Sequence, residues 1–81
     1  MKYEVIVYSS DSCSYCLKLK KWLTENNIPY QYKDISNQQI YNEFEEFKVN
    51  GIPFIRLIDN NNVEKRIVGF QPKDIKQFLG L

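Results

Sequence analysis

Two cysteines three positions apart carry the chemistry that this sequence offers. Cys13 and Cys16 are the two cysteines of the 81-residue chain, and they follow a strand-like run and open a helix-like one. A thiol attacks a disulfide as the thiolate, and a free thiol with a pKa of about 8.5 is mostly protonated at neutral pH. If Cys13 caps the helix, the unpaired N–H groups of the first turn favour its anionic form. The spacing therefore predicts a dithiol redox centre.

The positions of the two thiols predict different roles. Cys13 stands at the mouth of the helix, where we expect an exposed nucleophile. Cys16 stands one turn further on nearly the same face, where we expect a partly covered thiol that attacks the mixed disulfide formed at Cys13. We expect the ring of Tyr15 to form one wall of a substrate groove, and Lys18 or Lys20 to add weak, screened positive potential.

A proline at the mouth of a later strand is a second candidate element of this site. Gly51-Ile52-Pro53 places a proline after a β-branched residue. A cis peptide at this point would leave the backbone of Ile52 free to pair with an extended thiol-containing substrate. The sequence leaves the isomer open, since most X-Pro bonds are trans.

Composition excludes several classes of function. The chain has no histidine, which removes Ser-His-Asp and Cys-His catalysis and every imidazole metal site. Its formal charge is +1 with mixed signs, so neither nucleic acid nor an anionic membrane is an expected partner. No secretory signal or membrane-spanning run is apparent, and we expect a cytoplasmic protein, in which a close cysteine pair is catalytic or metal-binding.

The pattern of apolar residues predicts one domain over residues 1–81 with the element order βαβαββα. We expect strands over 3–9, 30–35, 53–58 and 63–68, and a first helix over 14–26. Ser36 and Gln39 have the form of a capping box for a second helix, and Pro72 suits the first turn of a third. Right-handed crossover then favours a layered α/β fold with a parallel strand pair and an antiparallel hairpin.

These motifs together resemble the glutaredoxin family of the thioredoxin fold, over Tyr3 to about Leu79. The resemblance rests on Cys13-Ser14-Tyr15-Cys16 after a strand, on Gly51-Ile52-Pro53 and on Gly69 after the last strand. It implies a four-stranded mixed sheet flanked by three helices, and a thiol-disulfide oxidoreductase with Cys13 as nucleophile, Cys16 as resolving thiol and a cis Pro53 in the substrate groove. The positions that hold glutathione in such proteins match Tyr15, Ile52, Pro53, Gly69, Phe70 and Gln71.

The resemblance also implies partners. The substrate would be a disulfide-containing protein or a small thiol compound, and glutathione would be the reducing co-substrate. We expect a monomer with no metal and no tightly bound cofactor.

Three departures from the family pattern leave the electron source open. Ser10 replaces a basic residue, and Val68-Gly69-Phe70-Gln71 replaces Gly-Gly-x-Asp, which weakens the expected grip on glutathione carboxylates. Gly69-Phe70-Gln71-Pro72 is instead similar to redoxins that are recharged by thioredoxin reductase and donate electrons to ribonucleotide reductase. Ser14 replaces a proline, and some members with serine there assemble a glutathione-ligated iron–sulfur cluster between two subunits. A non-catalytic docking module and an inert cysteine pair are the remaining alternatives.

Overall fold

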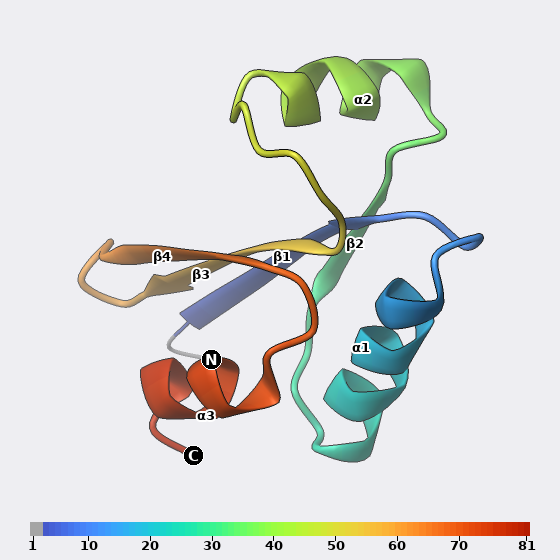
Figure 1. Cartoon of the computed structure of the whole chain (residues 1–81). Coiled ribbons are helices and arrows are strands. Elements are labelled where there is room, and N and C mark those ends of the chain that lie inside the picture. Colours follow the sequence, from blue (N-terminus) through green and yellow to red (C-terminus); the bar gives the residue numbers. More distant parts are fainter. Residues whose placement is uncertain (1–2) are drawn as a thin grey trace.

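The computed structural model describes residues 3–81 and shows a mixed sheet with helices on both faces (Figure 1). Along the sheet the strand order is β2-β1-β3-β4, with β1 parallel to β2 and antiparallel to β3, and β3 antiparallel to β4. The predicted element order βαβαββα is confirmed. The elements are β1 (Tyr3–Ser9), α1 (Ser14–Glu25), β2 (Gln31–Asp34), α2 (Gln38–Glu45), β3 (Phe54–Asp59), β4 (Glu64–Val68) and α3 (Pro72–Leu79).

Strand β1 is central and apolar on both faces, as its alternation predicts. Val5 and Val7 point into a core shared with α1 and α3, whereas Ile6 and Tyr8 point into a second core beneath α2. Figure 1 shows this division, with α1 and α3 on one side of the sheet and α2 on the other. Because each face is buried, the sheet holds the end of β1 and the start of α1 in a fixed relation.

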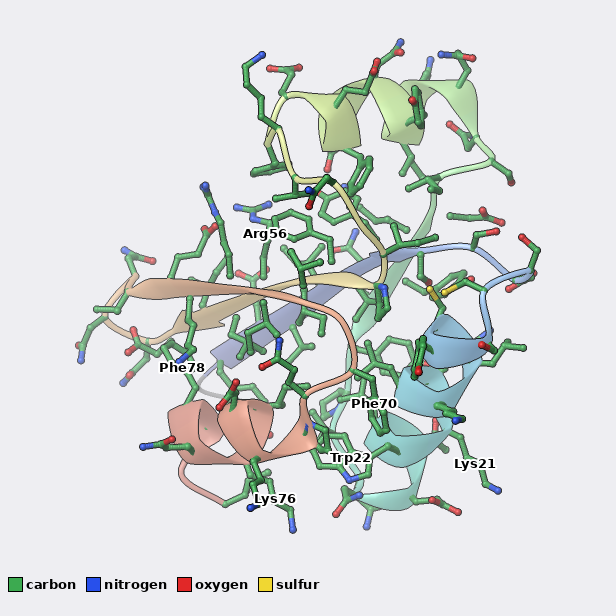
Figure 2. All side chains as sticks on the ribbon, viewed as in Figure 1. Lys21, Trp22, Arg56, Phe70, Lys76 and Phe78 are labelled. Carbon is green, nitrogen blue, oxygen red and sulfur yellow. The ribbon has the colours of Figure 1, made fainter. Side chains whose placement is uncertain are left out.

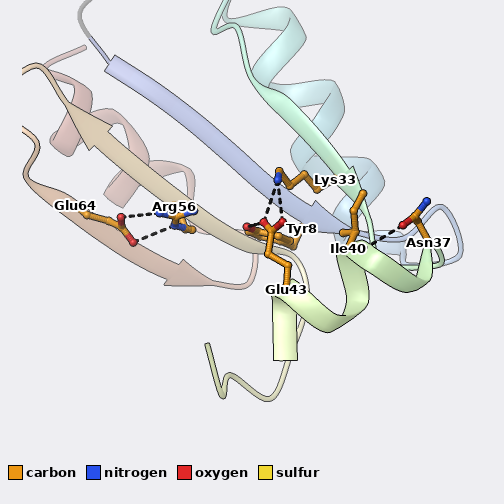
Figure 3. Close-up of polar contacts among 7 residues, drawn as sticks. All are labelled: Tyr8, Lys33, Asn37, Ile40, Glu43, Arg56 and Glu64. Atoms are coloured by element: carbon orange, nitrogen blue, oxygen red, sulfur yellow. Dashed lines mark hydrogen bonds and ion pairs between the residues drawn. The ribbon is translucent and has the colours of Figure 1, made fainter. Parts of the chain in front are cut away.

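The predicted start of the second helix is wrong. Asn37, and not Ser36, is the N-cap of α2: its Oδ1 accepts the N–H of Gln39 at 3.0 Å and that of Ile40 at 3.2 Å, the second of which Figure 3 shows. The backbone N–H of Ser36 is turned away and donates to Oδ1 of Asp34 at 2.9 Å. Asparagine caps a helix at least as well as serine, and here it stands one residue nearer the first turn.

The remaining boundaries shift by one or two residues. Helix α1 ends at Glu25 with Asn26 as its C-cap, and β3 begins at Phe54, directly after Pro53. Strand β2 is shorter at both ends than predicted, and β4 begins at Glu64. Helix α3 begins at Pro72 as predicted.

Polar contacts tie α2 to the sheet and join the two hairpin strands, β3 and β4, to each other (Figure 3). The buried Tyr8 hydroxyl donates to the carboxylate of Glu43 on α2, and Nζ of Lys33 on β2 lies 2.9 Å from the same carboxylate. The Tyr8 hydrogen bond and then Lys33 lower the pKa of Glu43. On the hairpin, the Arg56 guanidinium donates to both carboxylate oxygens of Glu64 at 3.0 and 3.1 Å. Such paired hydrogen bonds fix the relative orientation of the two side chains in addition to pairing their opposite charges.

The Arg56–Glu64 pair predicts a defined loss of stability in acid. Hydrogen bonds from Arg56 and then Arg66 lower the pKa of Glu64 from 4.5 to about 2, so its stabilising effect is complete above pH 4.5 and is lost as pH falls through about 2. Replacement of Glu64 by Gln should lower the free energy of unfolding at pH 6 on the order of 1 kcal/mol, allowing for solvent screening. Urea titrations at pH 6 and pH 2 measure this.

The matched control for this prediction is Glu45→Gln, an exposed carboxylate on α2. It should leave the free energy of unfolding unchanged at both pH values. A Glu64→Gln deficit that persists undiminished at pH 2 would contradict the linkage.

Candidate active site

Cys13 is the N-cap of α1. Its backbone is extended, with φ −100° and ψ 117°, and its Sγ accepts the backbone N–H of Cys16 at 3.2 Å. The first turn of α1 contains no acidic residue that would oppose negative charge on this sulfur. The groups that face the Cys13 sulfur are therefore the donors and the positive dipole end that an attacking thiolate needs.

Cys16 lies behind Cys13 and is 2% exposed. Burial, and then the hydrogen bond with Cys13, raise the pKa of the Cys16 thiol to about 11. Both cysteines are free thiols, and Cys13 is the more exposed of the two. Cys16 consequently holds its proton at neutral pH until another group removes it.

The loop before β3 lies against the Cys13 sulfur. Sγ of Cys13 is 4.0 Å from the carbonyl oxygen of Ile52, and the peptide bond between Ile52 and Pro53 is cis. The carbonyl of Pro53 in turn accepts the N–H of Gly69 at 2.8 Å. Gly69 has φ 94°, a conformation that favours glycine, at the turn that leads from β4 toward α3. The structure thus brings three of the predicted segments, around residues 13, 52 and 69, to one end of the sheet.

The other predicted site residues lie at the edge of this group. Tyr15 is 59% exposed, with Nζ of Lys18 5.2 Å from its ring centroid. The ring of Phe70 packs edge-on against Trp22 of α1, with ring centroids 6.5 Å apart (Figure 2). The amide of Gln71 donates to the carbonyl of Val68 at 2.8 Å. Phe70 therefore serves packing and Gln71 closes the turn.

A cluster of residues beside Cys16 was not predicted. Ser9 is fully buried at the end of β1, and its Oγ has no hydrogen-bond partner among the described residues. The Tyr32 hydroxyl donates to Oδ1 of Asp11 at 2.8 Å, and Nζ of Lys20 lies 4.4 Å from the centroid of the Tyr32 ring. Lys20 thus contacts Tyr32. The alternation of β1 is the pattern that could have placed Ser9 on the α1 side.

Within residues 3–81 no three or more Cys, Asp or Glu side chains are grouped so that they could hold a metal ion. In the same part of the chain no helix is both long and apolar enough to cross a membrane.

The burial of Cys16 predicts unequal alkylation of the two thiols. In a Cys16→Ser variant, iodoacetamide should label Cys13 readily at pH 7. In a Cys13→Ser variant, Cys16 should stay unlabelled at pH 7 and react faster as pH rises, because it is buried and burial, the largest cause of its raised pKa, remains in this variant. Mass spectrometry of quenched samples measures both rates. Equal labelling of the two variants at pH 7 would contradict the assignment.

Comparison with known proteins agrees with this geometry. A family model described as glutaredoxin matches residues 5–63. The global transcriptional regulator Spx 1 of Bacillus cereus is 55% identical over 31 residues, which are 38% of this chain and 24% of that protein. The chain thus matches about a quarter of the length of this curated relative.

Solved structures share the fold over nearly the whole chain. The glutaredoxin of Methanosarcina mazei Go1 is 31% identical with a TM-score of 0.69, covering 96% of this chain and 79% of that one. A mutant of the thioredoxin-like protein BC3987 is 22% identical with a TM-score of 0.75, covering 95% of each chain. The architecture is therefore the thioredoxin fold. Because the family model covers most of the chain and includes both cysteines, the chain belongs to the glutaredoxin family, a family of thiol-disulfide oxidoreductases.

Proposed function

We propose that this protein reduces disulfides of proteins or of small thiol compounds by dithiol exchange, with Cys13 as nucleophile and Cys16 as resolving thiol. The observation that carries the proposal is the position of the Cys13 sulfur, which accepts a helix N–H from Cys16 and lies beside the Ile52 carbonyl. A helix N-terminus favours an anionic sulfur, and an adjacent unpaired backbone accepts an extended substrate.

In the first step the Cys13 thiolate attacks one sulfur of the substrate disulfide. The substrate S–S bond breaks, a new S–S bond joins Cys13 to one half of the substrate, and the other half leaves as a thiolate that takes a proton from solvent. The backbone of Ile52 borders the Cys13 sulfur just before β3, and it is positioned to align the substrate chain.

In the second step Cys16 loses its proton and attacks the Cys13 sulfur. The second half of the substrate leaves, and a disulfide joins Cys13 to Cys16. The hydrogen bond between the Cys16 N–H and the Cys13 sulfur shows that the two residues are in contact before reaction. An external reductant then restores both thiols.

Replacement of the cysteines one at a time tests these roles. Cys13→Ser should reduce insulin disulfides no faster than the uncatalysed background, because the attacking sulfur is gone. Cys16→Ser should form the mixed disulfide at Cys13 and stop there, so intact-mass spectrometry should find a trapped adduct. Turbidity of reduced insulin, with dithiothreitol as reductant, measures the rates.

Ser36→Ala is the matched control, since it removes an exposed hydroxyl from the loop before α2. It should reduce insulin at the wild-type rate. Reduction at that rate by Cys13→Ser would sink the proposal.

We further propose that a flavoprotein thioredoxin reductase, and not glutathione, supplies the electrons. Three positions at which family members bind glutathione carry uncharged side chains, namely Ser10, Phe70 and Gln71. Phe70 is packed against Trp22 and the Gln71 amide is bonded to the Val68 carbonyl. These positions would therefore offer the glutathione carboxylates no cationic side chain with which to form an ion-paired hydrogen bond.

A comparison of two reductants tests this choice. The oxidised protein should consume NADPH faster with thioredoxin reductase than with glutathione and glutathione reductase. A Ser10→Lys, Gln71→Asp double variant should gain roughly tenfold in the glutathione reaction, because the lysine offers a cation to a glutathione carboxylate and the aspartate offers an anion to the glutathione ammonium group. Faster turnover of the wild type with glutathione, or no gain in the double variant, would contradict the proposal.

A further inference from the structure

The buried hydroxyl of Ser9 lies where the redox chemistry needs a proton acceptor. Ser9 is fully buried, and its Oγ has no hydrogen-bond partner among the described residues. Buried polar groups in folded proteins are nearly always satisfied, so an unpartnered one points to a role that the resting state does not show.

Ser9 faces the resolving cysteine. Side chains alternate along β1, and Val5 and Val7 point into the core beneath α1 and α3, so Ser9 points to the same side. Cys16 enters that side from the first turn of α1 and is 2% exposed. Burial is the largest cause that raises the pKa of Cys16, and the nearby Ser9 hydroxyl is among the smaller causes that lower it. The Ser9 hydroxyl therefore lies next to the Cys16 thiol.

Tyr32 is the second neighbour of Ser9 on the α1 side of the sheet. It pairs with Val7 in the parallel register of β1 and β2, which puts its side chain on the α1 side of the sheet. Burial raises the pKa of Tyr32, whereas the nearby Ser9 hydroxyl acts to lower it. At neutral pH Tyr32 is therefore a neutral phenol that can both accept and donate a proton.

The outer end of this cluster reaches solvent at Asp11. The Tyr32 hydroxyl donates to Oδ1 of Asp11 at 2.8 Å, and Asp11 is exposed. Lys20 of α1 lies over the Tyr32 ring with Nζ 4.4 Å from its centroid, which holds the ring in place. Asp34 of β2 is the further charged group that acts on Tyr32.

We propose that Ser9, Tyr32 and Asp11 form a proton relay that connects the buried Cys16 thiol to solvent. The relay rests on the proposed dithiol mechanism and serves its second step. As the Cys16 sulfur attacks Cys13, its proton passes to the Ser9 oxygen, the Ser9 proton passes to the Tyr32 oxygen, and the Tyr32 proton passes to the Asp11 carboxylate. The bond from Cys13 to the substrate sulfur breaks, and the leaving thiolate takes a proton from solvent.

The chain offers Cys16 few other bases. It contains no histidine, and burial, the largest cause of the raised pKa of the Cys16 thiol, persists in the mixed disulfide, so little of this thiol is ionised at pH 7. Cys13 is the titratable group that hydrogen-bonds to Cys16, and in the mixed disulfide its sulfur carries no charge. A relay that removes the Cys16 proton during the attack makes the rate independent of the small ionised fraction of Cys16.

The two steps can be timed separately with the aromatic disulfide DTNB. Attack by Cys13 releases one chromogenic thiolate, and resolution by Cys16 releases a second, so stopped-flow absorbance shows two phases. Ser9→Ala and Tyr32→Phe should slow the second phase about tenfold at pH 7 and leave the first unchanged, a loss within the range of a lost proton-transfer group. Asp11→Asn should slow the second phase by a smaller factor.

The pH profile distinguishes a relay from a packing effect. The slowing in Ser9→Ala and Tyr32→Phe should shrink as pH rises toward the raised pKa of Cys16, where this thiol ionises directly. Tyr41→Phe removes an exposed phenol on α2, across the sheet, and should leave both phases unchanged. Circular dichroism of each variant checks the fold. Ser9→Ala keeps the strand backbone and Tyr32→Phe keeps the aromatic ring, so neither change should remove a core contact.

Three outcomes overturn the relay. The first is a second phase that is equally fast in wild type, Ser9→Ala and Tyr32→Phe. The next is a slowing by the same factor at every pH, which marks a packing role. The last is a wild type that lacks the second phase, or a first phase that survives Cys13→Ser: either result defeats the dithiol mechanism itself, and the relay with it.

Discussion

The contact between the Cys13 sulfur and the first turn of α1 is the interaction on which this site depends. A helix leaves its first N–H groups without partners inside the helix, and the Cys13 side chain takes the place that an asparagine or serine oxygen takes in other helices. The same turn buries Cys16 one step further in, where burial raises the pKa of its thiol. One turn of helix therefore places two chemically identical groups in opposite environments.

The sheet makes this arrangement possible by bringing distant segments to one end. Strand β1 is central, and the turn that follows it carries Cys13, while β3 runs antiparallel beside it and begins directly after Pro53. Gly69 closes the group through its hydrogen bond to the Pro53 carbonyl. The segments around the Cys13 sulfur are consequently loops whose positions are set by strands buried on both faces.

Patterns of local origin could be predicted from the sequence. The apolar alternation of β1, the capping position of Cys13 and the proline at the start of α3 are decided by neighbouring residues, and each agrees with the structure. The start of α2 was mispredicted because Ser36 and Asn37 are both good caps, and the side-chain hydrogen bond of Asp34 engages the Ser36 backbone instead.

Contacts between distant residues could not be predicted in the same way. The pairing of Tyr32 with Asp11 and the paired hydrogen bonds of Arg56 and Glu64 depend on strand register and on rotamers. Neither the strand register nor the rotamers can be read from a single sequence, because both are decided only when the sheet is assembled. The lack of a hydrogen-bond partner at Ser9 is likewise a property of the folded interior.

The alternation of β1 also limits how the chain can change in length. Tyr8 and Ser9 are adjacent, yet Tyr8 belongs to the aromatic core beneath α2 and Ser9 to the side of the sheet that holds Cys16. Inserting or deleting one residue in this strand would exchange them, directing a phenol toward the thiols and a hydroxyl into the aromatic rings. Tolerated insertions and deletions are thus confined to the loops, such as the turn between β3 and β4, where side chains do not alternate between two buried faces of a sheet.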